Sequence, residues 1–141
     1  MTAPHRGHVA LVTGSTGEGM GRSIALTLAR DGADIVLNTG TNRHTSQATN
    51  DRLLRTAESL GVRAMLVEAK TQDGAAVRGM FARARRELGP VDILINNAGG
   101  IWDPKIDLTK VDDTFWHDVL RAEIDGMFHT IKAALPARRR R

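Results

Sequence analysis

The sequence contains neither cysteine nor tyrosine among its 141 residues. Without cysteine there can be no disulfide, no thiolate nucleophile and no cysteine-ligated metal site. Histidine, aspartate and glutamate show no spacing typical of a metal site either, so we expect no bound metal. The lack of tyrosine removes one of the side chains that enzymes use as a general acid or base, and serine is absent beyond Ser59.

Long hydrophobic runs are also missing. No stretch approaches the roughly 20 apolar residues that cross a membrane. The N-terminal residues lack the apolar core of a secretory signal. We therefore expect a cytoplasmic protein with no membrane partner.

An excess of charge of one sign is absent from the body of the chain. The formal net charge is +4, but the last four residues, 138–141, are all arginine. Acidic and basic side chains therefore balance in the remainder, and we expect no nucleic-acid partner. Residues 137–141 are expected to form a disordered basic tail, since chain ends usually fray.

What the sequence does contain is a regular alternation of short apolar runs and amphipathic stretches. The apolar runs predict four strands, at residues 9–12, 33–38, 62–67 and 91–95. The amphipathic stretches predict helices at residues 20–30, 46–60, 73–88 and 109–135, the last with Thr109 and Asp112 as its N-cap pair.

Strands that alternate with helices fold as a parallel sheet with right-handed crossovers. We expect a Rossmann-like, doubly wound α/β domain over residues 1–136, with its strands in the order 3-2-1-4. The order in which strands are added to the sheet reverses between strands one and four, and the loops after these two strands line the crevice where ligands bind.

The loop after the first predicted strand is rich in glycine. Gly14 permits a tight turn, while Gly19 and Gly21 let the backbone approach a ligand and let the helix pack closely on the strand. Backbone N–H groups at such a helix N-terminus can hold a phosphate. The matching loop after the fourth predicted strand is also marked by glycine, at residues 96–100.

These two loops resemble those of the short-chain dehydrogenase/reductase family. The resemblance is carried by the glycine turn, by Asn96-Asn97-Ala98-Gly99, and by Thr114-Phe115-Trp116 at the start of the last predicted helix. It runs from about residue 9 to residue 136 and covers only the N-terminal, cofactor-binding portion, so we expect a sheet truncated after four strands. It implies an oxidoreductase that transfers a hydride between a nicotinamide cofactor and a carbonyl or alcohol.

The resemblance also implies which residues bind the cofactor. They are Gly14, Ser15, Thr16, Gly19, Met20, Gly21, Thr39, Arg43, Asn97, Ala98 and Gly99. The end of the second predicted strand carries no acid that would reject a 2′-phosphate. Thr39, Arg43 and Arg22 could hold that phosphate, which favours NADP, and NAD stays an alternative.

Three features depart from the family pattern. The glycine turn is one residue longer than usual, and it carries Glu18, whose carboxylate we expect to point to solvent, away from a phosphate. Lys70 stands after the third strand, where the family usually has an aspartate that contacts the adenine.

The family's catalytic set is missing from this chain. Its serine, tyrosine and lysine follow a fifth strand, and an asparagine in the last helix is matched here by Glu123. We therefore assign no catalytic residue and leave open whether the chain is an enzyme. The alternative is a non-catalytic nucleotide-binding or protein-interaction module.

The last predicted helix carries an apolar stripe that has no obvious cover. Its members are Trp116, Leu120, Ile124, Met127, Ile131 and Leu135. The fourth strand would likewise leave an exposed sheet edge. We expect a homo-oligomer that pairs through the final helix or through the strand-four edge.

Overall fold

The computed structural model describes residues 3–40, 45–99 and 106–138. It contains a four-stranded parallel sheet with the order β3-β2-β1-β4, which confirms the predicted topology. The strands are β1 (Val9–Val12), β2 (Asp34–Thr39), β3 (Ala64–Glu68) and β4 (Ile93–Ile95).

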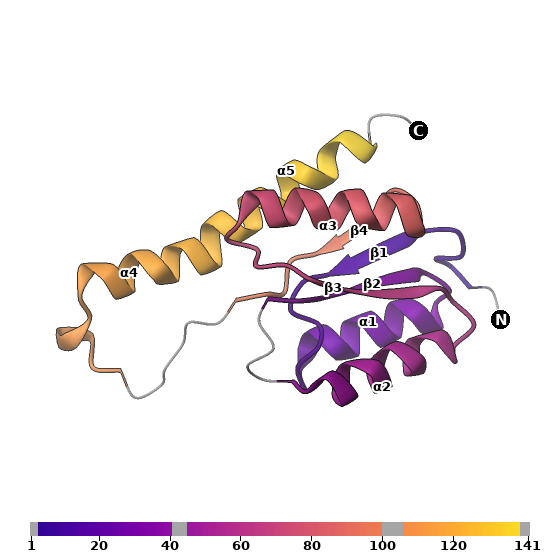
Figure 1. Ribbon diagram of the computed structural model, residues 1–141, viewed down its shortest axis with the longest axis horizontal. Coiled ribbons are helices and arrows are strands. Elements are labelled where there is room, and N and C mark those ends of the chain that lie inside the picture. The colour runs from indigo at the N-terminus through magenta and orange to yellow at the C-terminus, as the bar shows by residue number, and fades with distance from the viewer. Residues whose placement is uncertain (1–2, 41–44, 100–105, 139–141) are drawn as a thin grey trace.

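Helices cover both faces of this sheet (Figure 1). The helices α1 (Met20–Arg30) and α2 (Gln47–Glu58) pack on one face, against Ala10 and Val12. The helix α3 (Gly74–Glu87) packs on the other face, against Val9 and Leu11, with α5 (Gly126–Arg138) beside it. Successive β1 residues face opposite sides, so a strand that is apolar throughout is buried on both faces.

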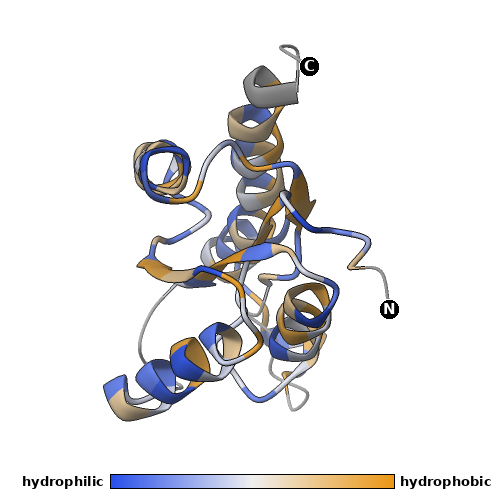
Figure 2. Ribbon diagram, turned by 90° about the vertical axis from the view of Figure 1, so that its right-hand side faces the viewer, coloured by the Kyte–Doolittle hydropathy of each residue, from blue (hydrophilic) through white to orange (hydrophobic). Residues whose placement is uncertain are grey.

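The hydropathy of the elements follows this layering. The strands are largely hydrophobic, while the helices mix hydrophobic and hydrophilic positions (Figure 2). Among the described residues, no helix is long and apolar enough to cross a membrane.

Polar side chains cap three of the helices at their N-termini. Ser46 accepts a hydrogen bond from the Thr49 N–H at the start of α2. The Asp73 carboxylate accepts hydrogen bonds from the Ala76 and Ala75 N–H groups at the start of α3. These N–H groups hold the pKa of the Asp73 carboxyl below its ordinary value. Asp112 caps α4 (Asp113–Leu120) by accepting from the Phe115 N–H.

The final helix differs from its prediction in two ways. The chain around Thr109 forms a separate 3₁₀ turn, Leu108–Lys110, because the carboxylate of Asp107 accepts the Thr109 N–H and side-chain hydroxyl. Thr109 therefore does not begin the helix, which starts only after Asp112. The helix is also not uniform, since a π-helical segment, Arg121–Asp125, joins α4 to α5.

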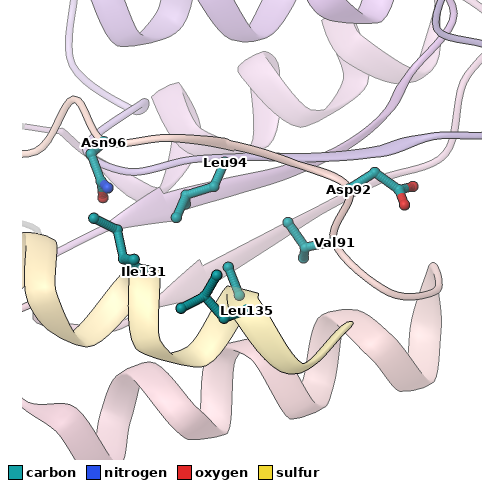
Figure 3. A pocket seen from close by; sticks show the side chains of 7 residues that line it. Val91, Asp92, Leu94, Asn96, Ile131 and Leu135 are labelled. Atoms are coloured by element: carbon teal, nitrogen blue, oxygen red, sulfur yellow. The ribbon is translucent and has the colours of Figure 1, made fainter. Parts of the chain in front are cut away.

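The apolar stripe of this final helix lies on the surface. Its side chains are between 37% and 55% exposed, namely those of Trp116, Leu120, Ile124, Met127, Ile131 and Leu135, and the nearby Phe128 is 57% exposed. A groove of about 300 Å³ runs between the stripe and β4 (Figure 3). It is lined by Val91, Asp92, Leu94 and Asn96 from the strand side and by Ile131, Ala134 and Leu135 from α5.

Candidate functional site

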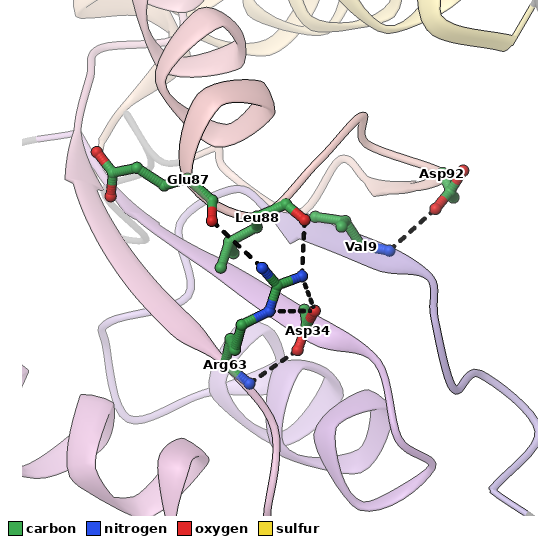
Figure 4. A network of polar contacts seen from close by, with 6 residues as sticks. All are labelled: Val9, Asp34, Arg63, Glu87, Leu88 and Asp92. Carbon is green, nitrogen blue, oxygen red and sulfur yellow. Dashed lines mark hydrogen bonds and ion pairs between the residues drawn. The ribbon is translucent and has the colours of Figure 1, made fainter.

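The two ends of the sheet have different roles. At the amino ends of the strands, polar groups are tied to one another (Figure 4). The guanidinium of Arg63 binds the Asp34 carboxylate and donates to the Leu88 carbonyl at the end of α3, with the Nη2–O distance 2.8 Å. Asp92 accepts the Val9 N–H at 3.0 Å. This end of the sheet is therefore held by its own contacts, and the candidate site lies at the carboxyl ends.

At the carboxyl ends, a buried threonine joins the loops that follow β1 and β4. The hydroxyl of Thr13 accepts the backbone N–H groups of Asn97 at 3.0 Å and Ala98 at 2.9 Å. The Asn97 amide donates in return to the carbonyls of Thr13 and Gly14, at 3.0 and 3.1 Å. The two loops expected to line the crevice thus form one unit. The sequence analysis did not identify Thr13, whose partners lie more than 80 residues away.

Close packing at this junction requires glycine at two positions. Gly14 has a φ of +62°, and a Cβ placed there would come within 2.9 Å of the Ala98 Cα. A Cβ at Gly21 would press on the Asn97 amide and lie 2.7 Å from the Gly14 carbonyl oxygen. Both residues therefore keep α1 and the β4 loop close to the first strand, as the sequence predicts for Gly21.

The N-terminus of α1 is built differently from those of α2, α3 and α4. Its N-cap is Gly19, which has an extended backbone and no side chain to offer the first N–H groups. Apart from its chain neighbours, a Cβ at Gly17 or Gly19 would meet no atom of the described residues within 4 Å. Met20 beside them is 77% exposed. The positive end of this helix is therefore open, and it can receive an anionic group.

Glu18 lies where the sequence predicts, pointing to solvent. Its side chain is 88% exposed, and a carboxylate oxygen lies 3.9 Å from Arg22 Nη1. The other arm of the Arg22 guanidinium donates to the Thr16 carbonyl at 2.7 Å, which braces the glycine turn.

The hydroxyl residues expected at the cofactor are buried. The Ser15 hydroxyl accepts the Asn38 N–H at 3.0 Å, and the Ser15 N–H donates to the Asn38 carbonyl at 2.9 Å. Thr16 lies in the glycine turn and Thr39 at the end of β2. Arg43 lies outside the described residues.

Asn38 is a second residue that the sequence analysis missed. Its buried amide accepts from the Gly14 N–H at 3.2 Å and donates to the carbonyls of Val67 and Ala69, at 3.3 and 3.1 Å. It therefore ties the glycine turn to the end of β3. In the sequence, Asn38 could have been noticed as a polar residue that directly follows the apolar run of β2.

One acidic group reaches the second loop from the final helix. The Glu123 carboxylate, in the π-helical segment, lies against Gly99. Lys70, after β3, is exposed. In the described part of the chain, no group of three or more His, Asp or Glu side chains could hold a metal ion.

Comparison with protein families identifies this architecture. The family model described as short chain dehydrogenase matches residues 8–141. The chain belongs to the short-chain dehydrogenase family. Among curated relatives, the 3-oxoacyl-[acyl-carrier-protein] reductase FabG of Escherichia coli (strain K12) is 36% identical over 131 residues, covering 93% of this chain and 49% of the relative. The FabG of Staphylococcus aureus (strain Mu50) is 32% identical over 127 residues, covering 90% and 49%.

Two solved structures have a similar fold. A short chain dehydrogenase from Burkholderia cenocepacia J2315 in complex with NADP superposes with a TM-score of 0.84 at 29% identity, covering 94% of this chain and 51% of that one. A blue fluorescent protein from a metagenomic library in complex with NADPH gives 0.83 at 34% identity, covering 93% and 51%. The chain therefore spans about half the length of the relatives it matches.

Proposed function

We propose that this chain binds a nicotinamide dinucleotide at the junction of the β1 and β4 loops, as the cofactor-holding half of a short-chain oxidoreductase. The observation that carries the proposal is the open N-terminus of α1, where Gly17 and Gly19 leave room for a pyrophosphate. When bound, the nicotinamide would give or accept the hydride exchanged with a carbonyl or alcohol. The relatives bound to NADP and NADPH support this assignment.

Some residues of the proposed site would contact the cofactor directly, and others would only shape the site. Backbone groups around Gly19, Met20 and Gly21 would hold the pyrophosphate, and the loop at Asn97, Ala98 and Gly99 would border the nicotinamide half. Gly14, Ser15 and Thr16 would act through the shape of the turn and Thr39 through the end of β2, because their side chains are buried or absent.

We further propose that NADP is preferred over NAD. The sequence offers no acid at the end of β2 to bind a ribose 2′-hydroxyl. Arg22 stands beside the glycine turn, and within the described residues its buried Nε has no hydrogen-bond partner. Arg22 and Arg43 are the proposed cationic partners of the 2′-phosphate.

Titration of the purified protein tests the cofactor site. NADPH should bind more tightly than NADH, and Gly19→Ala should weaken NADPH at least tenfold, since the new methyl group would occupy the space left for the pyrophosphate, a loss of about 1.4 kcal/mol or more. Fluorescence titration gives both dissociation constants. Gly79→Ala, on the open surface of α3, is the matched control and should leave them unchanged. Equal binding of NADH would contradict the preference, and no binding would contradict the site.

A second candidate function is a non-catalytic nucleotide-binding module. It is favoured by the absence of tyrosine from the whole sequence. Turnover of ketones with NADPH by this chain alone would refute it, and cofactor binding without turnover would support it.

We also propose that the chain forms a homodimer through the final helix. The exposed stripe from Trp116 to Leu135 is continuous along α4 and α5, and the groove beside β4 extends it. Four acidic residues, Asp113, Asp118, Glu123 and Asp125, outnumber Arg121 in the first part of this helix, whereas Lys132 and Arg138 lie in its last part. Two copies packed antiparallel would therefore match apolar stripes and opposite charges.

Light scattering after size exclusion tests the dimer. The protein should elute as a dimer at micromolar concentration, and Ile131→Asp should yield a monomer, because it places a charge within the apolar stripe. Leu60→Asp, a similarly exposed leucine beyond α2, should remain dimeric. A monomeric wild-type protein would overturn the proposal.

A further inference from the structure

A carboxylate stands directly at the loop after β4. A Cβ built on Gly99 would lie 2.7 Å from Glu123 Oε2 and 2.8 Å from Oε1. Both oxygens therefore occupy the space that any other residue at position 99 would fill. Glu123 is itself exposed, so a molecule bound in the crevice can approach it.

The backbone on both sides of Glu123 is anchored. Ala122 is buried, and Gly126 is packed so closely that a Cβ there would lie 2.7 Å from Thr71 Oγ1. One turn further, the Thr130 hydroxyl donates to Asn96 Oδ1 at 2.6 Å. The π-helical segment is thus held against the ends of β3 and β4, and this places the carboxylate at the Gly99 loop.

The topology decides which half of a dinucleotide would meet this carboxylate. With the pyrophosphate at the N-terminus of α1, the adenosine ribose extends toward the end of β2, where dinucleotide-binding folds contact it. The other half must then extend to the opposite side of β1, over the loop that follows β4. Glu123 and Gly99 therefore border the nicotinamide side.

The oxidised and reduced forms of the cofactor differ in the charge of the nicotinamide ring. The oxidised ring carries one positive charge, and the reduced ring is neutral. A carboxylate near the ring attracts only the oxidised form, and because Glu123 is exposed, water screens the attraction to a modest size.

We propose that Glu123 makes this site select the oxidised cofactor over the reduced one. The inference rests on the proposed function, since it requires a dinucleotide at the junction of the β1 and β4 loops. It assigns Glu123 a role in cofactor discrimination and no part in proton transfer. Gly99 serves the same role indirectly, because only glycine leaves room for the carboxylate.

The test compares dissociation constants for NADP⁺ and NADPH, measured by calorimetry on the wild-type protein, Glu123→Gln and Asp125→Asn. Removing the charge while keeping the shape should weaken NADP⁺ relative to NADPH by roughly three- to tenfold. Asp125→Asn is the matched control, because a residue two positions along the helix lies roughly on its opposite side, and it should keep the wild-type ratio.

The outcomes separate this inference from the function it rests on. If both cofactors bind and Glu123→Gln leaves the ratio unchanged, the inference is wrong and the proposed function stands. If Asp125→Asn changes the ratio as much as Glu123→Gln, the effect belongs to the general charge of the helix, and the inference is again wrong. If neither form binds the wild-type protein, the proposed function and the inference both fail.

Discussion

Gly14→Ala is expected to destabilise the protein by about 2–4 kcal/mol and to abolish cofactor binding. Two effects add at this position. The φ of +62° is strained for a residue with a Cβ, and that Cβ would stand 2.9 Å from the Cα of Ala98. The obstructing atom belongs to the backbone, which Thr13 and Asn97 hold in place, so it cannot move aside cheaply. Urea unfolding followed by circular dichroism measures the loss.

Gly61→Ala separates the two effects. Gly61 also has a positive φ, of +85°, but among the residues that the structure describes a Cβ there would meet nothing within 4 Å beyond its chain neighbours. Its substitution should cost only the backbone strain, about 1 kcal/mol, and should leave cofactor binding intact. Equal losses of stability in the two variants would show that the contact with Ala98 is unimportant.

Asn38→Asp should have a comparable effect, a loss of about 3–5 kcal/mol at neutral pH. The amide nitrogen of Asn38 donates to the carbonyls of Val67 and Ala69 in a fully buried place. A carboxylate would turn an oxygen toward those carbonyl oxygens and would bury a charge at a place where the hydrogen bonds that Asn38 makes within the described residues involve only neutral groups. Asn38 Oδ1 also accepts a hydrogen bond from the Gly14 N–H. The substitution should therefore make the glycine turn less ordered and lower the affinity for NADPH.

The same chemical change at Asn96 provides the control. Asn96 is exposed, and its side-chain oxygen accepts from Thr130, a role that a carboxylate oxygen can keep. Asn96→Asp should therefore change the free energy of unfolding by less than about 1 kcal/mol. Stability measured across pH gives a further check, because protonation of the new carboxyl should restore part of the loss in Asn38→Asp only.

Most of the fold could be predicted from the sequence, because local patterns determine it. Apolar runs such as Val9–Val12 gave the strands, and the helix Met20–Arg30 was predicted at the bounds it has. The start of the final helix was predicted wrongly. Thr109 and Asp112 both suit an N-cap, and the choice between them depends on Asp107, which captures the Thr109 N–H in a turn of its own. The π-helical segment has no signature in the sequence that we can name.

The candidate site was predictable in its glycines and not in its hydrogen bonds. Gly14 and Gly21 follow from a strand, a turn and a helix that are adjacent in sequence. Thr13 and Asn38 owe their roles to partners 23 to 85 residues away, which no local pattern specifies. The sequence suggests that the Ser15 hydroxyl binds a phosphate, but in the structure this hydroxyl accepts a hydrogen bond from the Asn38 N–H.

The central position of β1 has a consequence for how the chain folds. Ala10 pairs with Ile35 on one side and with Ile93 on the other, which closes loops of 25 and 83 residues. The longer closure costs about 1 kcal/mol more in chain entropy. The β1–β2 pair should therefore form first, and one flank of β1 should stay open until the ribosome has released β4. During synthesis the nascent chain would then expose the edge of a strand that is apolar throughout, which makes it a candidate client for a chaperone that binds extended apolar segments.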